Sequence, residues 1–184
     1  MLRYTQKTDI LDLLIIKNRV FQDPRGYFVE TYNEKTFAEN GIITKFVQDN
    51  RSKSSYGVIR GLHYQLNPHS QAKLVSVVVG KVFDVAVDLR KNSSTFGKWY
   101  GVELSDENHL QFLIPQGFAH GFSVLSETAI FSYKCDNFYA PQSEGGIIYN
   151  DASLNIDWKI PAEKAVVSDK DLKLPLLKDV KLNF

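Results

Sequence analysis

The 184-residue chain is 43% hydrophobic, and its 22 basic residues nearly balance 21 acidic ones. This length suits one domain, residues 1–184, with a single core. The near-neutral balance argues against nucleic acid or a membrane surface as a partner, because proteins that bind either one normally carry a strong excess of basic residues. A single cysteine, Cys135, excludes an intramolecular disulfide. With neither a secretory leader nor a membrane span expected, the composition predicts a cytoplasmic protein.

Strand-like segments follow one another along most of the chain. They are rich in β-branched and aromatic residues, and Gly, Pro, Asn or Ser separates most of them. The predicted strands are residues 11–20, 27–32, 43–51, 57–64, 72–79, 82–89, 98–104, 110–114, 118–125 and 129–136. Residues 33–40, followed by Gly41, predict a short helix, and residues 162–170 predict a helical turn. The pattern indicates an all-β antiparallel sandwich or barrel with a few short helices.

Two stretches are more specific than the strand pattern. They read GVIRGLHYQ at 57–65, followed by Lys73 and Gly80, and PQGFAH at 115–120. These resemble the two motifs of the cupins, which are small jelly-roll barrels. The places of the cupin metal ligands hold His63, Gln65, Lys73 and His120. Glutamine is a poor ligand and an ammonium repels a cation. We therefore expect a jelly-roll, cupin-like β-barrel without a metal.

Alternation along the strands predicts which side chains share a face. His63 and Gln65 lie two apart and would both face the interior, and Lys73 would lie among valines on the next strand. A lysine on an inward face is costly unless it is paired or used. Asp84 and Asp88 share a face and could pair with it. An edge or surface lysine is the alternative interpretation of Lys73.

Other residues allow both a functional and a structural interpretation. Arg60 lies within an apolar strand three residues before His63, and a guanidinium suits a diphosphate. Arg25 follows a turn, where arginine is usually solvated. A catalytic histidine needs a carboxylate to fix its tautomer, and without one His63 would be a core residue. Tyr133 allows core packing as well as catalysis, and Cys135 is typical of a small buried hydrophobe.

The ordered run of motifs resembles the dTDP-4-dehydrorhamnose 3,5-epimerase family. The matching pieces are PRGYFVE (24–30), QDN (48–50), VIRGLHYQ (58–65), QAKLV (71–75), DVAVDLR (84–90), IPQGFAHGF (114–122), YKCDNFYAP (133–141), ND (150–151) and SDKD (168–171). Each piece alone is modest, but their combination and order are highly specific. Together they extend from about residue 20 to residue 175.

This resemblance implies residue roles. His63 would be the general base with Asp171 as its carboxylate partner, Tyr133 the acid on the opposite sugar face, and Lys73 the cation that stabilises the enolate oxygen. The residues implied to contact substrate are Phe21, Arg25, Glu30, Gln48, Asp49, Asn50, Arg60, His120, Tyr139, Glu144 and Lys170. Of these, Phe21 and Tyr139 would stack on thymine. The resemblance also implies a homodimer, a dTDP-sugar substrate and no cofactor.

The implied reaction inverts C3 and C5 of dTDP-4-dehydro-6-deoxy-glucose to give dTDP-4-dehydro-L-rhamnose through an enolate. One alternative is a mono-epimerase or 3,4-ketoisomerase that acts on a related dTDP- or GDP-linked keto-sugar. A second is a non-catalytic cupin that binds a sugar nucleotide, and a more distant third is a metal-dependent cupin oxygenase. Proton exchange at C3 and C5 separates the epimerase from the pure binder.

Overall fold

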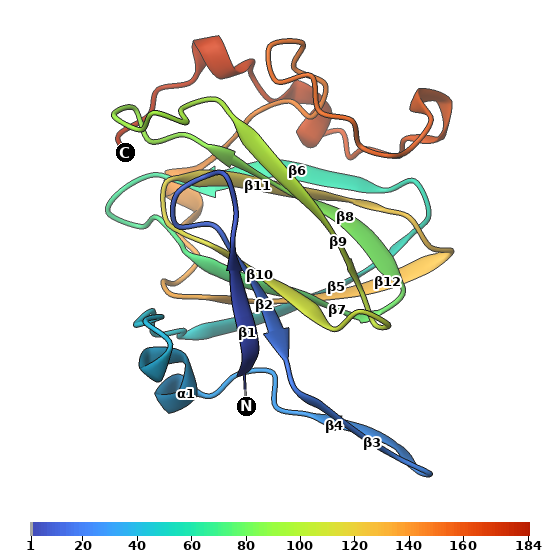
Figure 1. Ribbon diagram of the computed structural model, residues 1–184. Helices are drawn as coiled ribbons and strands as arrows, with labels where there is room; N and C mark the ends of the chain where they lie inside the picture. The colour runs from blue at the N-terminus through green and yellow to red at the C-terminus, as the bar shows by residue number, and fades with distance from the viewer. Residues whose placement is uncertain (1) are drawn as a thin grey trace.

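Two antiparallel sheets face one another in the computed structural model, which describes residues 2–184 (Figure 1). The strand order in the six-stranded sheet is β1 (Leu2–Lys7), β2 (Leu14–Asn18), β10 (Leu110–Ile114), β7 (Lys73–Val79), β12 (Thr128–Cys135) and β5 (Gln48–Ser55). The order in the five-stranded sheet is β13 (Glu144–Gly146), β6 (Ile59–Gln65), β11 (Phe118–Val124), β8 (Lys81–Asp88) and β9 (Trp99–Ser105). Most neighbouring strands are distant in sequence. This is the cupin-like jelly roll that the sequence predicted.

Each predicted strand overlaps an observed strand, but three observed strands were not predicted. The predicted strand 11–20 is divided, because β2 ends at Asn18 and β3 (Val20–Asp23) pairs instead with β4 (Gly26–Val29) in a separate hairpin. β1 and β13 were missed entirely, and β3 was missed apart from Val20. β1 is a polar strand at the sheet edge, and β13 has three residues, two of them glycine. Neither shows the apolar alternation that marks a strand.

The predicted helix 33–40 is confirmed as α1 (Glu34–Glu39). The Asn33 side chain caps it by accepting a hydrogen bond from the backbone nitrogen of Thr36 at 3.1 Å. Gly41, which follows the C-cap, has a φ of 80° that suits glycine. The predicted turn 162–170 is shorter than expected. The short 3₁₀ turns are η1 (Pro141–Ser143), η2 (Ala162–Lys164), η3 (Asp171–Lys173) and η4 (Leu177–Asp179).

Apolar side chains fill three layers. The space between the sheets is packed by buried residues such as Val75, Phe112 and Phe131. The C-terminal segment, orange to red in Figure 1, covers the outer face of the five-stranded sheet and places Trp158 there. α1 covers part of the other sheet's outer face through Phe37. Each large buried side chain contributes about 1.5–3 kcal/mol. Both sheets are therefore held in place from inside and outside.

A bulge in β6 determines which of its side chains face the interior. His63 pairs with His120 of β11, and Arg60 pairs with Phe122, so one extra residue of β6 lies between these two pairs. Paired residues of antiparallel strands share a face, and thus Arg60 and His63 lie on the same face although they are three apart. Strict alternation would place them on opposite faces. Gly61 allows the close approach, because a Cβ at this position would lie 2.6 Å from the Cα of Gly121.

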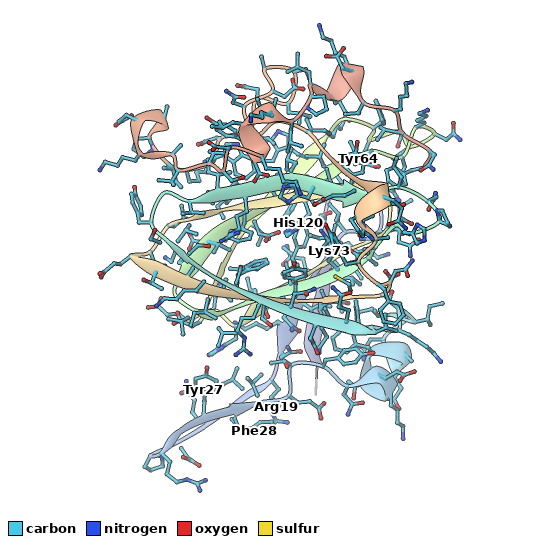
Figure 2. All side chains as sticks on the ribbon, turned by 180° about the vertical axis from the view of Figure 1, so that it is seen from behind. Arg19, Tyr27, Phe28, Tyr64, Lys73 and His120 are labelled. Carbon is cyan, nitrogen blue, oxygen red and sulfur yellow. The ribbon has the colours of Figure 1, made fainter. Side chains whose placement is uncertain are left out.

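The β3–β4 hairpin projects away from the two sheets (Figure 1). Its aromatic side chains are largely exposed, at 67% for Phe28 and 55% for Tyr27, and both lie outside the sheets in Figure 2. Arg25 at its tip is bound by the neighbouring Asp23 at 2.6 Å. Within residues 2–184, no helix is long and apolar enough to cross a membrane.

Candidate active site

A cavity of about 280 Å³ opens between the two sheets. The residues that line it are Gln48, Asn50, His63, Tyr64, Gln65, Gln71, Lys73, Tyr133, Tyr139 and Glu144. Three other hollows are larger, at about 350, 480 and 580 Å³, and Tyr133 is the only one of the four predicted catalytic residues that lines any of them. The 280 Å³ cavity is the candidate site because it unites three of the four predicted catalytic residues.

His63 and Asp171 form a hydrogen-bonded pair at the wall of this cavity. The His63 Nε2 lies 2.8 Å from the Asp171 Oδ1, and the backbone nitrogen of Gly61 donates to the Asp171 Oδ2 at 3.3 Å. Asp171 is only 4% exposed. An Nε2–H that donates to this carboxylate leaves the Nδ1 lone pair available to accept a proton. Burial lowers the pKa of His63, while Asp171 opposes this shift, so the imidazole is neutral and able to act as a base near pH 7.

Tyr133 reaches the cavity from the opposite sheet. It lies on β12 in the six-stranded sheet, whereas His63 lies on β6 in the five-stranded sheet. Burial raises the pKa of the Tyr133 hydroxyl above 10.0, so this group carries its proton at neutral pH. The arrangement therefore presents a proton acceptor on one wall of the cavity and a proton donor on the facing wall.

Lys73 lies on β7 in the lining of the cavity and is half-buried, and Figure 2 shows its side chain between the sheets. Its Nζ lies 6.0 Å from the ring centroid of Tyr133. Burial lowers the pKa of the ammonium group, and the negative charge of Asp84 acts in the opposite direction. A cation in this place is suited to stabilise negative charge that develops on a bound ligand.

His120 lies behind the cavity rather than in its lining. Its side chain is 8% exposed, and its Nε2 lies 3.0 Å from each carboxylate oxygen of Asp84. The prediction that Asp84 and Asp88 pair directly with Lys73 is wrong. His120 binds the Asp84 carboxylate, while the Asp88 carboxylate accepts hydrogen bonds from Arg90 and neighbouring hydroxyls that keep its pKa at about 2.

Charged and aromatic side chains surround the cavity mouth. Glu144 accepts hydrogen bonds from Lys170 at 2.8 Å and from the Tyr139 hydroxyl at 3.2 Å. Gln48 accepts from the backbone nitrogen of Tyr139 at 3.0 Å and donates to Asn50 at 3.2 Å. Tyr139 is 57% exposed, which leaves its ring face available to a flat ligand group.

Seven predicted substrate contacts do not line the cavity within this chain, and two of them, His120 behind the wall and Lys170 at the mouth, are described above. Arg60 is exposed, and its Nε donates to Ser54 at 3.0 Å. Asp49 forms an exposed ion pair with Lys134 at 2.9 Å. The others are Phe21 and Arg25 on the projecting hairpin, and Glu30 just after it. The sequence pattern could not show that the hairpin residues lie away from the cavity, because the direction in which a hairpin projects is not a local property of its residues.

Three lining residues had no predicted role in binding. Gln65 accepts a hydrogen bond from the backbone nitrogen of Ala140 at 2.8 Å and donates to the carbonyls of His69 and Phe138 at 2.6 and 3.2 Å. Gln65 thus holds the loop that carries the cavity mouth. The sequence signal that could have identified it is its predicted inward-facing position, two residues after His63. Tyr64 and Gln71 gave none. Among residues 2–184, no group of three or more His, Cys, Asp or Glu side chains is placed to hold a metal ion.

Fold and cavity together define a class of protein, the cupin-like jelly rolls, here with a histidine and a tyrosine on facing sheets of the cavity. Residues 7–179 match the family model described as dTDP-4-dehydrorhamnose 3,5-epimerase. The chain therefore belongs to the dTDP-4-dehydrorhamnose 3,5-epimerase family, whose members are isomerases. It is 58% identical over 167 residues to a dTDP-4-dehydrorhamnose 3,5-epimerase of Shigella flexneri, with coverage of 90% of this chain and 91% of that one.

Solved structures agree with this assignment. The crystal structure of dTDP-4-dehydrorhamnose 3,5-epimerase from Elizabethkingia anophelis matches with a TM-score of 0.91 and 62% identity, covering 96% of this chain and 97% of that one. A dTDP-6-deoxy-D-glucose-3,5-epimerase from Legionella pneumophila, in complex with dTDP-4-keto-L-rhamnose, matches with a TM-score of 0.93 and 50% identity, covering 97% and 94%.

Proposed function

We propose that this enzyme inverts C3 and C5 of dTDP-4-dehydro-6-deoxy-glucose and releases dTDP-4-dehydro-L-rhamnose. The observation that carries the proposal is the placement of His63 and Tyr133 on facing sheets, with Lys73 in the lining of the same cavity. Inversion requires that a proton leave one face of the sugar and return to the other. Two groups on opposite walls of one cavity meet that requirement, and a single group does not.

In the proposed mechanism, both reacting protons are acidified by the C4 ketone. His63 removes a proton from C3 or C5, and the electron pair moves onto the C4 oxygen as an enolate. The ammonium of Lys73 stabilises that oxygen, an interaction worth about 3 kcal/mol or more for a preorganised donor. Tyr133 then donates its proton to the carbon from the opposite face. Asp171 holds the His63 ring and balances the charge that forms on it.

Substrate recognition in this proposal uses the groups around the mouth. Arg60 and Lys170 provide positive charge for the diphosphate, since guanidinium and ammonium groups bind phosphate oxygens well. Gln48, Asn50 and Glu144 offer polar atoms to the nucleoside or sugar. The exposed ring of Tyr139 stacks on thymine. His120 acts from behind the cavity wall.

The proposal includes a homodimer in the cytoplasm. Arg25 has an 89% exposed side chain at the tip of the projecting hairpin, and Phe21 is 43% exposed on the same hairpin. Neither residue lines the cavity of its own chain. If the hairpin reaches the cavity of a second copy, both residues can contact the nucleotide that is bound there. Cys135 is a free thiol, which suits a reducing compartment.

A hybrid dimer tests the exchange of hairpins. Arg25→Ala and His63→Ala variants should each have low activity, and mixing them with subunit exchange should restore about one quarter of wild-type activity, because half of the dimers are hybrids with one intact site. If each hairpin serves its own subunit, no hybrid has an intact site and mixing restores nothing. Size-exclusion chromatography with light scattering checks that the hybrids are dimers.

The reaction itself is tested by incubating the enzyme with dTDP-4-dehydro-6-deoxy-glucose in heavy water and following the sugar by NMR. We expect deuterium at both C3 and C5 and the coupling constants of the L-rhamno product. Deuterium at only one carbon would assign a mono-epimerase, and movement of the ketone from C4 to C3 would assign a ketoisomerase. Tight binding without exchange would contradict catalysis on this substrate.

A further inference from the structure

A short segment at the cavity mouth, residues 137–140, is held in place by side chains and belongs to no strand. Within residues 2–184, its one hydrogen bond to another backbone group is that of the Ala140 carbonyl, which accepts from the backbone nitrogen of Ser143 at 2.9 Å. Segments with so few backbone hydrogen bonds open readily unless other groups bind them. This segment carries Tyr139, so whatever binds it also determines where the Tyr139 ring lies.

Gln65 binds this segment on both sides of Tyr139. Its Oε1 accepts a hydrogen bond from the backbone nitrogen of Ala140 at 2.8 Å, and its Nε2 donates to the carbonyl of Phe138 at 3.2 Å. The same Nε2 donates to the carbonyl of His69 at 2.6 Å. A side-chain amide has two hydrogens to donate and one oxygen that accepts. Gln65 therefore lines the cavity with both of its hydrogens already used to hold the backbone.

Gln65 is a firm anchor because it belongs to a sheet. It is 5% exposed at the end of β6, where its backbone pairs with Glu144 of β13. Two further contacts reach Tyr139, since Glu144 accepts from its hydroxyl at 3.2 Å and Gln48 from its backbone nitrogen at 3.0 Å. Both are exposed to solvent, whereas the hydrogen bond from Ala140 to Gln65 is buried. Water can replace an exposed hydrogen bond, but it cannot easily replace a buried one.

We propose that Gln65 is a positioning residue that acts through Tyr139: it fixes the backbone on both sides of this tyrosine and so holds the ring in the orientation that receives the nucleobase. The position requires an amide, because one side chain must donate and accept hydrogen bonds at the same time. An ionised glutamate only accepts, and a neutral histidine donates only once. The stacking of a nucleobase on Tyr139 rests on the proposed function, but the fixing of the segment does not.

The fixing of the segment is tested without a ligand, by amide hydrogen exchange of the full-length enzyme followed by NMR. In Gln65→Met, which keeps the side chain's length and lacks its amide, the backbone amide of Ala140 should exchange about tenfold faster or more. Gln111→Met is the matched control. Gln111 is 4% exposed and accepts a hydrogen bond from Asn18 at 2.7 Å, but it lies on β10 and does not line the cavity. That variant should leave the exchange of Ala140 unchanged.

The action through Tyr139 is tested by the affinity for dTDP, measured by calorimetry in a double-mutant cycle. The apparent Kd rises as the inverse of the fraction of time that the segment holds its binding arrangement, so Gln65→Met should weaken binding by about tenfold. Tyr139→Ala should also weaken it. The double variant should bind no more weakly than Tyr139→Ala, because no ring remains to be positioned. If Gln65→Met does not fold, Gln65→Asn repeats both measurements with an amide that is one methylene shorter.

The kinetic consequence is a change in KM and not in kcat. Gln65→Met should raise KM for the dTDP-sugar and leave kcat within about twofold, because His63 and Tyr133 lie on strands that the segment does not hold. Unchanged exchange of Ala140 in folded Gln65→Met, or the same loss of dTDP affinity with and without the Tyr139 ring, would overturn the proposal. A wild-type enzyme that does not bind dTDP would contradict the proposed function alone, because the exchange measurement needs no nucleotide.

Discussion

Replacement of His63 by alanine should abolish epimerisation and solvent-deuterium exchange together, with a loss of about 10²–10⁴-fold or more at both carbons. The reason is that His63 is the neutral base of the cavity and makes the hydrogen bond of 2.8 Å to Asp171. Without a base, no enolate forms, and neither exchange nor inversion can follow. Deuterium incorporation and product formation are measured in the same heavy-water sample.

Two controls separate this loss from damage to the fold. The variant should keep its thermal unfolding temperature and its affinity for dTDP, since His63 is only partly buried and lies at the sugar end of the proposed site. Asp171→Asn should lose less activity than His63→Ala, because the imidazole remains but its orienting charge is gone. Near wild-type exchange in folded His63→Ala would remove His63 from the mechanism.

Replacement of Tyr133 by phenylalanine should separate exchange from inversion. Phenylalanine keeps the ring that packs beside Phe131 and removes only the hydroxyl. His63 can still form the enolate, but the proton from the facing sheet is missing, so reprotonation comes from the original face or from water. Deuterium should then enter C3 or C5 much faster than the sugar inverts. The measured quantity is the ratio of exchange rate to inversion rate.

Tyr100→Phe is the matched control for that experiment. Tyr100 is a partly buried tyrosine that packs against the same core cluster, but it lies on β9 and does not line the cavity. Loss of its hydroxyl should leave the ratio of exchange to inversion at the wild-type value. A wild-type ratio in Tyr133→Phe as well would contradict the assignment of acid and base to opposite faces.

The sequence predicts much of the fold because its strands are short, rich in β-branched and aromatic residues, and bounded by turn residues. α1 is predicted almost to the residue, since Asn33 and Gly41 mark its ends with side-chain and backbone chemistry that acts locally. β1 and β13 escape prediction because an edge strand is held by its backbone hydrogen bonds. Such bonds leave no trace in the pattern of side chains.

The site is predictable to a lesser extent. Alternation brings His63 and Gln65 to one face, but it misplaces Arg60 relative to them, because the bulge at Gly61 shifts the register. The pairing of His63 with Asp171, 108 residues away, follows from family resemblance alone. The choice of His120 as partner of Asp84 depends on the register in which β11 pairs with β8, which no local pattern contains.

The C-terminal segment has a second consequence beyond covering a sheet. It delivers Asp171 to the cavity on a chain of short 3₁₀ turns, and its backbone joins the five-stranded sheet through few hydrogen bonds, such as Val166 to Gly57 and Ile59 to Val166, both 2.9 Å. Segments with sparse backbone pairing open before the strands they cover. Detachment of this segment removes the carboxylate while the strands remain paired. We therefore expect turnover to be lost on heating at a lower temperature than that at which the sheets melt, and coincident loss of both would contradict a separate opening of this segment.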